Sequence, residues 1–178
     1  MSWVTACGGS STKDADTWRV SPARAEDAEL VHQIMCAAYL EYVGTVDPPM
    51  SATEESAAQV ADALGRGGAV LAWDGAAPVG SARYRISGDC VHIKRVSVLP
   101  EWRGRGIARA ILLYIEDLGR RHGCSRARLQ VRMSLSRNVK LYRRAGYQLI
   151  NIKPHPRGQD TVGTLVKELA GQAREEIV

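Results

Sequence analysis

An apolar stretch that runs through a glycine-bearing turn into a long amphipathic helix constrains this chain more than any other feature. The apolar stretch ends at Val98, the turn covers residues 99–105, and the helix follows from Gly106. The start of a helix presents free backbone N–H groups, and the helix dipole favours negative charge there. Glycines let the backbone approach a bulky anion, and Arg103 and Arg105 add charge suited to phosphate oxygens. The segment therefore predicts a site for a phosphate-bearing cofactor.

Two common phosphate-binding loops do not fit this segment. A P-loop ends in Gly-Lys-Ser or Gly-Lys-Thr, and the chain contains neither triplet. A dinucleotide fingerprint needs a third glycine after Gly104-x-Gly106, but Arg109 stands at that position. Both kinds of nucleotide loop are excluded.

The remaining match is to the GNAT superfamily of acyl-CoA-dependent N-acetyltransferases. Residues 103–108, which follow Val-Leu-Pro at 98–100, resemble the family signature Gln/Arg-x-x-Gly-x-Gly/Ala after a strand ending in Val-x-Pro. Residues 138–147 resemble a second family block, Asn-x-x-Leu-Tyr-x-x-x-Gly-Tyr/Phe. The two blocks are separated by the length of a helix, a strand and a second helix. The resemblance covers residues 18–170.

Hydrophobic periodicity and turn residues predict the order of the elements. Leu30, Ile34 and Ala38 recur at helical spacing, and Ser51-Ala52-Thr53-Glu54 is a capping box that would open a second helix. The helices are expected over 26–42, from 51 to the glycines at 65–68, and over 106–122 and 136–145. The strands are expected over 17–20, 69–73, 79–86, 90–98, 126–132, 147–152 and 162–169.

This order predicts an α/β fold with a mixed sheet and helices on both faces, because three hairpin strands precede a helix-strand-helix-strand series. The resemblance implies the GNAT fold, with about six to seven strands and about four helices. With 178 residues, 45% of them hydrophobic, the chain suits one buried domain. The expected organisation is a flexible leader over 1–16, a GNAT domain over 17–170 and a C-terminal tail over 171–178.

The strand before the turn changes its hydrophobic phase. Val91 and Ile93 occupy odd positions, whereas Val96 and Val98 occupy even ones. A β-bulge near residues 94–95 would produce this slip, and so would a strand buried on both faces. The resemblance implies a bulge that splays this strand from the next one. Backbone N–H groups would then face the cofactor and polarise the thioester carbonyl.

Acetyl transfer to an amine needs a neutral amine, a stabilised oxyanion and preferably a proton for the leaving thiolate. The resemblance assigns the proton donor to Tyr142, because a phenol with a pKa of about 10 stays protonated at neutral pH. The alternative is a half-buried tyrosine packed on the sheet. Asn138 lies one helical turn earlier and would contact the pantetheine arm of CoA, with helix capping as the alternative.

The resemblance implies a general base on the strand before the turn. His92 is the candidate, since its imidazole, with a pKa of about 6.5, can deprotonate an ammonium. The alternative is a histidine that only packs in the sheet. The acceptor pocket is expected around the first two helices, where its candidate residues are Tyr39, Tyr42, Arg83 and Tyr84.

The resemblance also implies a cofactor-binding set, whereas the wide spacing of the four cysteines argues against a metal site. The set joins the strand end, the turn, the start of the long helix and the second block: Val96, Ser97, Val98, Arg103, Gly104, Arg105, Gly106, Ile107, Ala108, Asn138 and Tyr142.

Net charge and the spacing of the cysteines indicate which partners and which cellular compartment suit this chain. The net charge is +5, which suits a CoA site because CoA carries several phosphate charges. Arginines at 120–132 could form a nucleic-acid surface, but no aromatic residues interleave with them, and a solvated face explains them more simply. No apolar run is long enough to span a membrane. Four widely spaced cysteines favour free thiols in a reducing cytoplasm.

The predicted activity is transfer of an acetyl group from acetyl-CoA to a primary amine of a small molecule by direct attack. Two alternatives stay open: an N-acetyltransferase for proteins or peptides, and a non-catalytic sensor that binds acyl-CoA. The expected partner is the small-molecule amine, with a homodimer left open and neither nucleic acid nor membrane involved.

Overall fold

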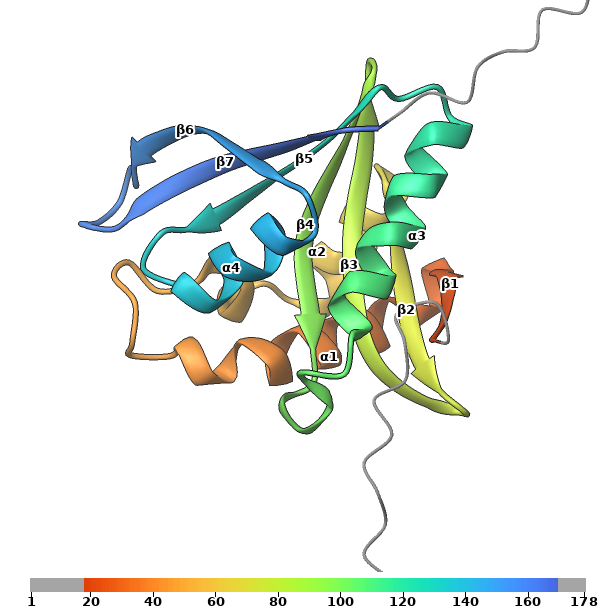
Figure 1. Ribbon diagram of the computed structural model, residues 1–178. Helices are drawn as coiled ribbons and strands as arrows, with labels where there is room; N and C mark the ends of the chain where they lie inside the picture. Colours follow the sequence, from red (N-terminus) through yellow and green to blue (C-terminus); the bar gives the residue numbers. More distant parts are fainter. Residues whose placement is uncertain (1–17, 170–178) are drawn as a thin grey trace, which may run out of the picture.

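The computed structural model describes residues 18–169, which hold a seven-stranded sheet and four α-helices (Figure 1). The leader predicted over 1–16 and the tail predicted over 171–178 lie outside the described residues. The helices are α1 (Ala28–Tyr39), α2 (Ala57–Gly65), α3 (Ile107–Arg121) and α4 (Ser136–Arg144). The strands are β1 (Arg19–Ala23), β2 (Gly68–Asp74), β3 (Ala77–Ser87), β4 (Cys90–Val98), β5 (Arg126–Arg132), β6 (Gln148–Pro154) and β7 (Thr161–Glu168).

The sheet order β1-β2-β3-β4-β5-β7-β6 confirms the predicted mixed sheet. The first four strands form an antiparallel series, in which tight turns at Gly75 and Gly88, both with positive φ, join β2 to β3 and β3 to β4. The connection through α3 makes β5 parallel to β4, and β7 then pairs antiparallel with both β5 and β6. None of the described helices is long and apolar enough to cross a membrane.

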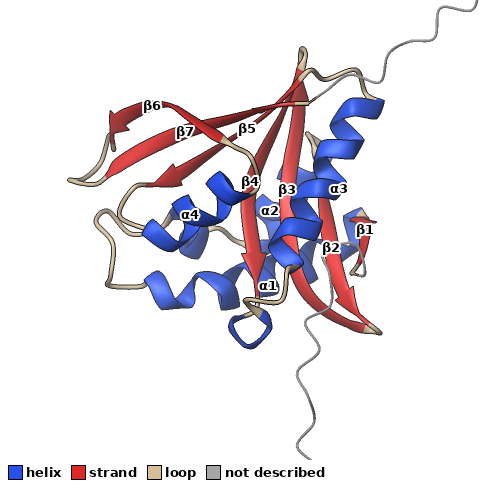
Figure 2. Cartoon of the chain, in the orientation of Figure 1, coloured by secondary structure: helices blue, strands red, loops and turns tan. Residues whose placement is uncertain are grey.

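Helices cover both faces of the β2–β4 part of the sheet. Side chains of α3 such as Ile111 and Ile115 pack against Val91 and Ile93 of β4. On the opposite face, α1 and α2 pack against Leu71 of β2. Figure 2 shows α3 in front of the strands and α1 and α2 behind them. The alternating side chains of β2 are therefore apolar on both faces.

The predicted start of the second helix is wrong by about one turn. Ser51–Glu54 forms a 3-10 turn, and Glu55 then takes an extended conformation. The helix begins after Ser56, where a second capping box operates: Gln59 N donates to Ser56 Oγ at 3.3 Å, and Ser56 N donates to Gln59 Oε1 at 2.8 Å. Both capping boxes fit the sequence pattern. The helix does not continue from the first box, because Glu55, which follows it, is extended and pairs with Arg83 and Arg95 of the sheet.

The predicted β-bulge is confirmed in β4. Ser81 pairs with Ser97 and Arg83 pairs with Lys94, so two residues of β4 oppose the single residue Ala82 of β3. The extra residue is Arg95, whose φ is 54°. The extra residue shifts the phase, which is why Val91, Ile93, Val96 and Val98 all contact the α3 side of the core.

Beyond the bulge, β4 and β5 separate. Their parallel pairing extends only from Cys90 and Arg126 to Ile93 and Leu129. Figure 1 shows the two strands diverging from a common start, with α4 across the opening. The later part of β4 therefore has a sheet partner on one side only.

Candidate active site

The turn before α3 exposes backbone N–H groups, as the sequence predicts. Gly104 and Gly106 have φ values of 75° and 85°, a conformation that favours glycine. Gly106 is the N-cap of α3, and the first helical hydrogen bond runs from Ala110 N to Gly106 O at 3.0 Å. The N–H groups of residues 107–109 consequently have no partner within the helix. A Cβ added at Gly104 would meet no atom within 4 Å, so the turn is open to an approaching group.

Aromatic side chains hold this turn in place. Trp18 Nε1 donates to the carbonyl oxygen of Arg105 at 2.8 Å. The Trp18 and Trp102 rings meet edge to face with 6.3 Å between their centroids. The Arg105 guanidinium lies over the Trp102 ring at 4.7 Å. The side chains of Trp18, Trp102 and Arg105 thus fix the shape of the turn.

Arg103 has structural partners that the sequence does not indicate. Its guanidinium donates to the carbonyl oxygens of Val98 at 3.1 Å and Ala38 at 2.8 Å, and it pairs with Glu41 at 2.6 Å. These bonds tie the turn to the C-terminal end of α1. The geometry gives Arg103 a positioning role, and its predicted contact with phosphate stays a prediction.

Tyr142 lies on α4, is buried and lines a cavity. Burial, followed by the neighbouring Tyr39 and Tyr42, raises the pKa of its phenol above the usual range. Within residues 18–169 its hydroxyl has no hydrogen-bond partner. The hydroxyl therefore keeps its proton at neutral pH and is available to donate it to a group in the cavity.

Asn138 lies one helical turn before Tyr142 on α4 and contacts Tyr42, which is also a neighbour of Tyr142. Its Nδ2 donates to Tyr42 Oη at 3.3 Å, and it also lines the cavity. The N-cap of α4 is Leu135, which makes no side-chain cap. The predicted contact of Asn138 with pantetheine stays a prediction, but its position beside Tyr142 fits that role.

His92 lines the same cavity from β4, before the bulge. Burial lowers the pKa of its imidazole, and the positive charges of Arg128, Lys94 and Arg85 lower it further. The imidazole is therefore neutral at pH 7 and can accept a proton. It lies about 13 Å along β4 from Val96 at the ordinary rise of a strand, so a proton from a substrate there would pass through water.

One cavity of about 1050 Å³ connects these groups. Its walls come from the α1–α2 segment, the middle strands, α4 and the β6–β7 turn. Tyr39, Arg83 and Tyr84 line it as predicted, whereas Tyr42 reaches the site only through Asn138. The α3 turn is not part of this wall. The fold thus separates a candidate acceptor cavity from a candidate anion-binding turn, with the β4–β5 opening between them.

The sequence model of the acetyltransferase (GNAT) family matches residues 30–147, about two thirds of the chain. The chain belongs to the GNAT family of acetyltransferases. It is an acyltransferase, which confirms the family and the enzyme class predicted from its sequence blocks.

Solved structures with the same fold include GNAT enzymes with different acceptors. The ribosomal-protein-S18-alanine N-acetyltransferase of Escherichia coli has a TM-score of 0.72 and 18% identity, over 91% of this chain and 99% of that one. PaiA N-acetyltransferase of Thermoplasma acidophilum, in complex with coenzyme A, has a TM-score of 0.72 and 16% identity, over 85% and 99%. A chimera based on spermidine N-acetyltransferase of Vibrio cholerae has a TM-score of 0.67 and 15% identity, over 85% and 95%. No curated protein sequence gives a significant match.

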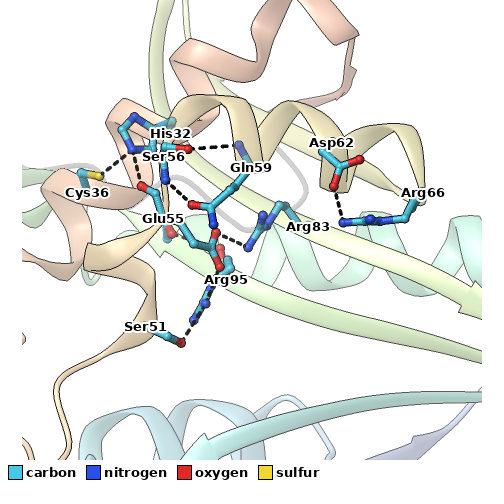
Figure 3. Close-up of polar contacts among 11 residues, drawn as sticks. His32, Cys36, Ser51, Glu55, Ser56, Gln59, Asp62, Arg66, Arg83 and Arg95 are labelled. Carbon is cyan, nitrogen blue, oxygen red and sulfur yellow. Dashed lines mark hydrogen bonds and ion pairs between the residues drawn. The ribbon is translucent and has the colours of Figure 1, made fainter.

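The sequence reasoning missed one structural residue of this GNAT site, Glu55. Its carboxylate accepts from Arg83 at 2.7 Å and from the bulge residue Arg95 at 2.5 Å, and Arg95 also donates to Ser51 Oγ at 3.0 Å (Figure 3). His32 lies on the backbone side of the same residue, 2.8 Å from Glu55 O. All these partners are distant in sequence except Ser51, so no local pattern marks Glu55.

The GNAT site holds no evident metal-binding arrangement. Across residues 18–169, no three His, Cys, Asp or Glu side chains are grouped so that they could hold a metal ion.

Proposed function

We propose that this enzyme transfers an acetyl group from acetyl-CoA to a primary amine of a small molecule by direct attack. The observation that carries the proposal is the hydroxyl of Tyr142, which lines the cavity and has no hydrogen-bond partner within residues 18–169. The coenzyme A complex of the Thermoplasma relative supports the donor. Three free cysteines, Cys36, Cys90 and Cys124, fit the expected reducing cytoplasm.

The donor half of the proposal rests on the α3 turn. The N–H groups of residues 104–108 and the dipole of the 15-residue α3 would hold the pyrophosphate. Arg103 keeps the turn against α1, and the opening beside β4 would admit the pantetheine arm next to Asn138. Acetyl-CoA, when bound, supplies the activated acyl group.

The transfer itself would use the β4 backbone and Tyr142. The neutral amine nitrogen attacks the carbonyl carbon of the thioester, the C–S bond breaks, and the sulfur leaves as a thiolate. The proton that the nitrogen loses as the amide forms would pass through water to His92. Backbone N–H groups of residues 96–98 would stabilise the negative oxygen. The Tyr142 hydroxyl would donate to the sulfur, and its raised pKa makes it a hydrogen-bond donor that holds its own proton until charge develops there.

The anion-binding turn can be tested with a matched pair of glycine variants. Gly104 and Gly123 both have positive φ, 75° and 78°, and an added Cβ meets nothing at either position. Each alanine variant should cost about 1 kcal/mol of stability because of this φ. Gly104→Ala should also raise the Kd for acetyl-CoA about tenfold, since its Cβ stands where the anion approaches. Calorimetry measures both Kd values, and an equal change in Gly123→Ala would contradict the assignment.

The base can be tested through the pH profile. His92 accepts a proton only when neutral, and its pKa lies below the usual value of about 6.5, so its contribution is complete at pH 7 and falls as pH drops through that lower pKa. We expect His92→Gln to remove this acidic limb from the dependence of kcat on pH. His122→Gln, at the end of α3, is the control. A limb that persists in His92→Gln would exclude His92 as the base.

Release of CoA distinguishes the proposed function from its two alternatives, an acyl-CoA sensor and an N-acetyltransferase for proteins. An acyl-CoA sensor would bind acetyl-CoA without releasing CoA in the presence of any amine. An N-acetyltransferase for proteins, like the Escherichia coli relative, would release CoA with peptides and not with small amines. Release of CoA across a panel of small amines and peptides therefore tests the proposed function directly.

A further inference from the structure

Three exposed basic side chains line one wall of the cavity from a single face of the sheet: Arg85 on β3, Lys94 on β4 and Arg128 on β5. We call them the basic cluster. His92 pairs in register with both Arg85 and Arg128, so these side chains come from directly adjacent positions of three strands. Lys94 is two residues from His92 and so faces the same side. The cluster therefore surrounds His92 on the cavity wall.

The basic cluster differs from the other basic residues of this cavity in having no acidic partner. Each of the others is paired with a carboxylate: Arg83 and Arg95 with Glu55, Arg66 with Asp62, and Arg132 with Asp160. No carboxylate of residues 18–169 lies within ion-pairing distance of the cluster. The two carboxylates that line the cavity, Glu55 and Asp62, are both in the paired set.

Unpaired like charges on adjacent strands repel one another and disfavour the folded sheet. The depressed pKa of His92 reports the same positive field, because the three cluster residues all contribute to it after burial. Such a field attracts an anion and repels a cationic ligand such as a polyamine. Lys94 is the residue of the basic cluster nearest to Val96 in β4. The two lie two positions apart, about 7 Å along the strand. An anion held there would lie within a small molecule's length of the proposed reaction centre.

We infer that the acceptor of this enzyme is a small amine that also carries an acidic group, a carboxylate or a phosphate, which the basic cluster binds. The inference rests on the proposed acetyl transfer and specifies its acceptor. The amine of such a molecule points toward Tyr142 and the β4–β5 opening, and its acidic group points toward Arg85 and Arg128. No carboxylate of residues 18–169 has to be displaced from the cluster when the molecule binds.

Matched amines test this inference. The carboxylate arm compares γ-aminobutyrate with its amide, the phosphate arm compares O-phosphoethanolamine with ethanolamine, and spermidine serves as the cationic amine. In at least one arm, kcat/KM for the acidic amine should exceed that for its neutral partner about 10- to 100-fold, the range for hydrogen bonds to charged groups. The arm with the larger ratio shows whether the acidic group of the acceptor is a carboxylate or a phosphate. Equal or better use of both neutral amines, or of spermidine, would overturn the inference.

The cluster is tested with Arg85→Gln and Arg128→Gln, made separately, with Arg121→Gln as the control. Arg121 is an exposed arginine at the end of α3 that pairs with Asp117, so its loss changes the net charge equally. Each cluster variant should lower the ratio of kcat/KM between the acidic and the neutral amine about tenfold. The Arg121→Gln variant should keep the ratio. An unchanged ratio in both cluster variants would refute the role of the cluster.

Failure of the proposed function gives a different result. An enzyme that does not bind acetyl-CoA in calorimetry, or releases no CoA with any of the five amines, contradicts the acetyl-transfer proposal itself. An enzyme that binds acetyl-CoA and acetylates neutral amines or spermidine preferentially contradicts only the acidic acceptor.

Discussion

Replacing Tyr142 by phenylalanine is expected to lower kcat about 100-fold, at the lower end of the range for loss of an acid catalyst. The hydroxyl lies on the cavity and has no partner within residues 18–169, so its removal leaves the packing of the ring intact. The Kd for acetyl-CoA should change less than about twofold, because the turn proposed to bind the pyrophosphate is unaffected. Release of CoA measures kcat, and calorimetry measures the Kd.

Tyr114→Phe is the matched control for this experiment. Tyr114 is a partly buried tyrosine of α3 that packs against the same core and does not line the cavity. Its variant should retain the wild-type kcat. A Tyr142→Phe enzyme with wild-type kcat would remove Tyr142 from the mechanism, and the thiolate would then leave without a proton from the protein.

Replacing Glu55 by alanine is expected to reduce both stability and turnover. The side chains of Arg83 and Arg95 are only 11% and 20% exposed, and Glu55 is their shared carboxylate. Removing one partner of such a group should cost about 3 kcal/mol. For a chain of this size we expect a fall in Tm of about 6–12 °C. Turnover should fall as well, because Arg95 is the bulge residue and Glu55 holds it at positive φ.

Glu54→Ala is the control, since Glu54 is exposed and makes no ion pair with another residue of the described chain. Thermal unfolding followed by circular dichroism gives both Tm values. Equal Tm values for the two variants would show that Glu55 does not anchor the bulge. A large fall in Tm with unchanged CoA release would separate the stability of the bulge from its role in transfer.

Much of the fold could be predicted because its signals are local. The phase slip between Ile93 and Val96 predicted the bulge, since side chains alternate strictly along a strand. The glycines at 104 and 106 predicted the open turn, since few other residues adopt their φ. The second helix shows the limit of such signals. Two capping boxes only five residues apart fit the sequence, and the helix begins at the later one, after the long-range ion pairs of Glu55.

The sequence by itself determined the family, the order of the strands and helices, and the position of the glycine-bearing turn before α3. These depend on residue spacing, which backbone geometry converts directly into structure. Only the tertiary structure decided which charges are paired. Arg103 contacts α1, Arg83 and Arg95 share Glu55, and Arg85 and Arg128 are left to face the cavity. Ion pairing depends on which residues the folded sheet places within about 4 Å of each other, and sequence spacing does not encode these long-range distances.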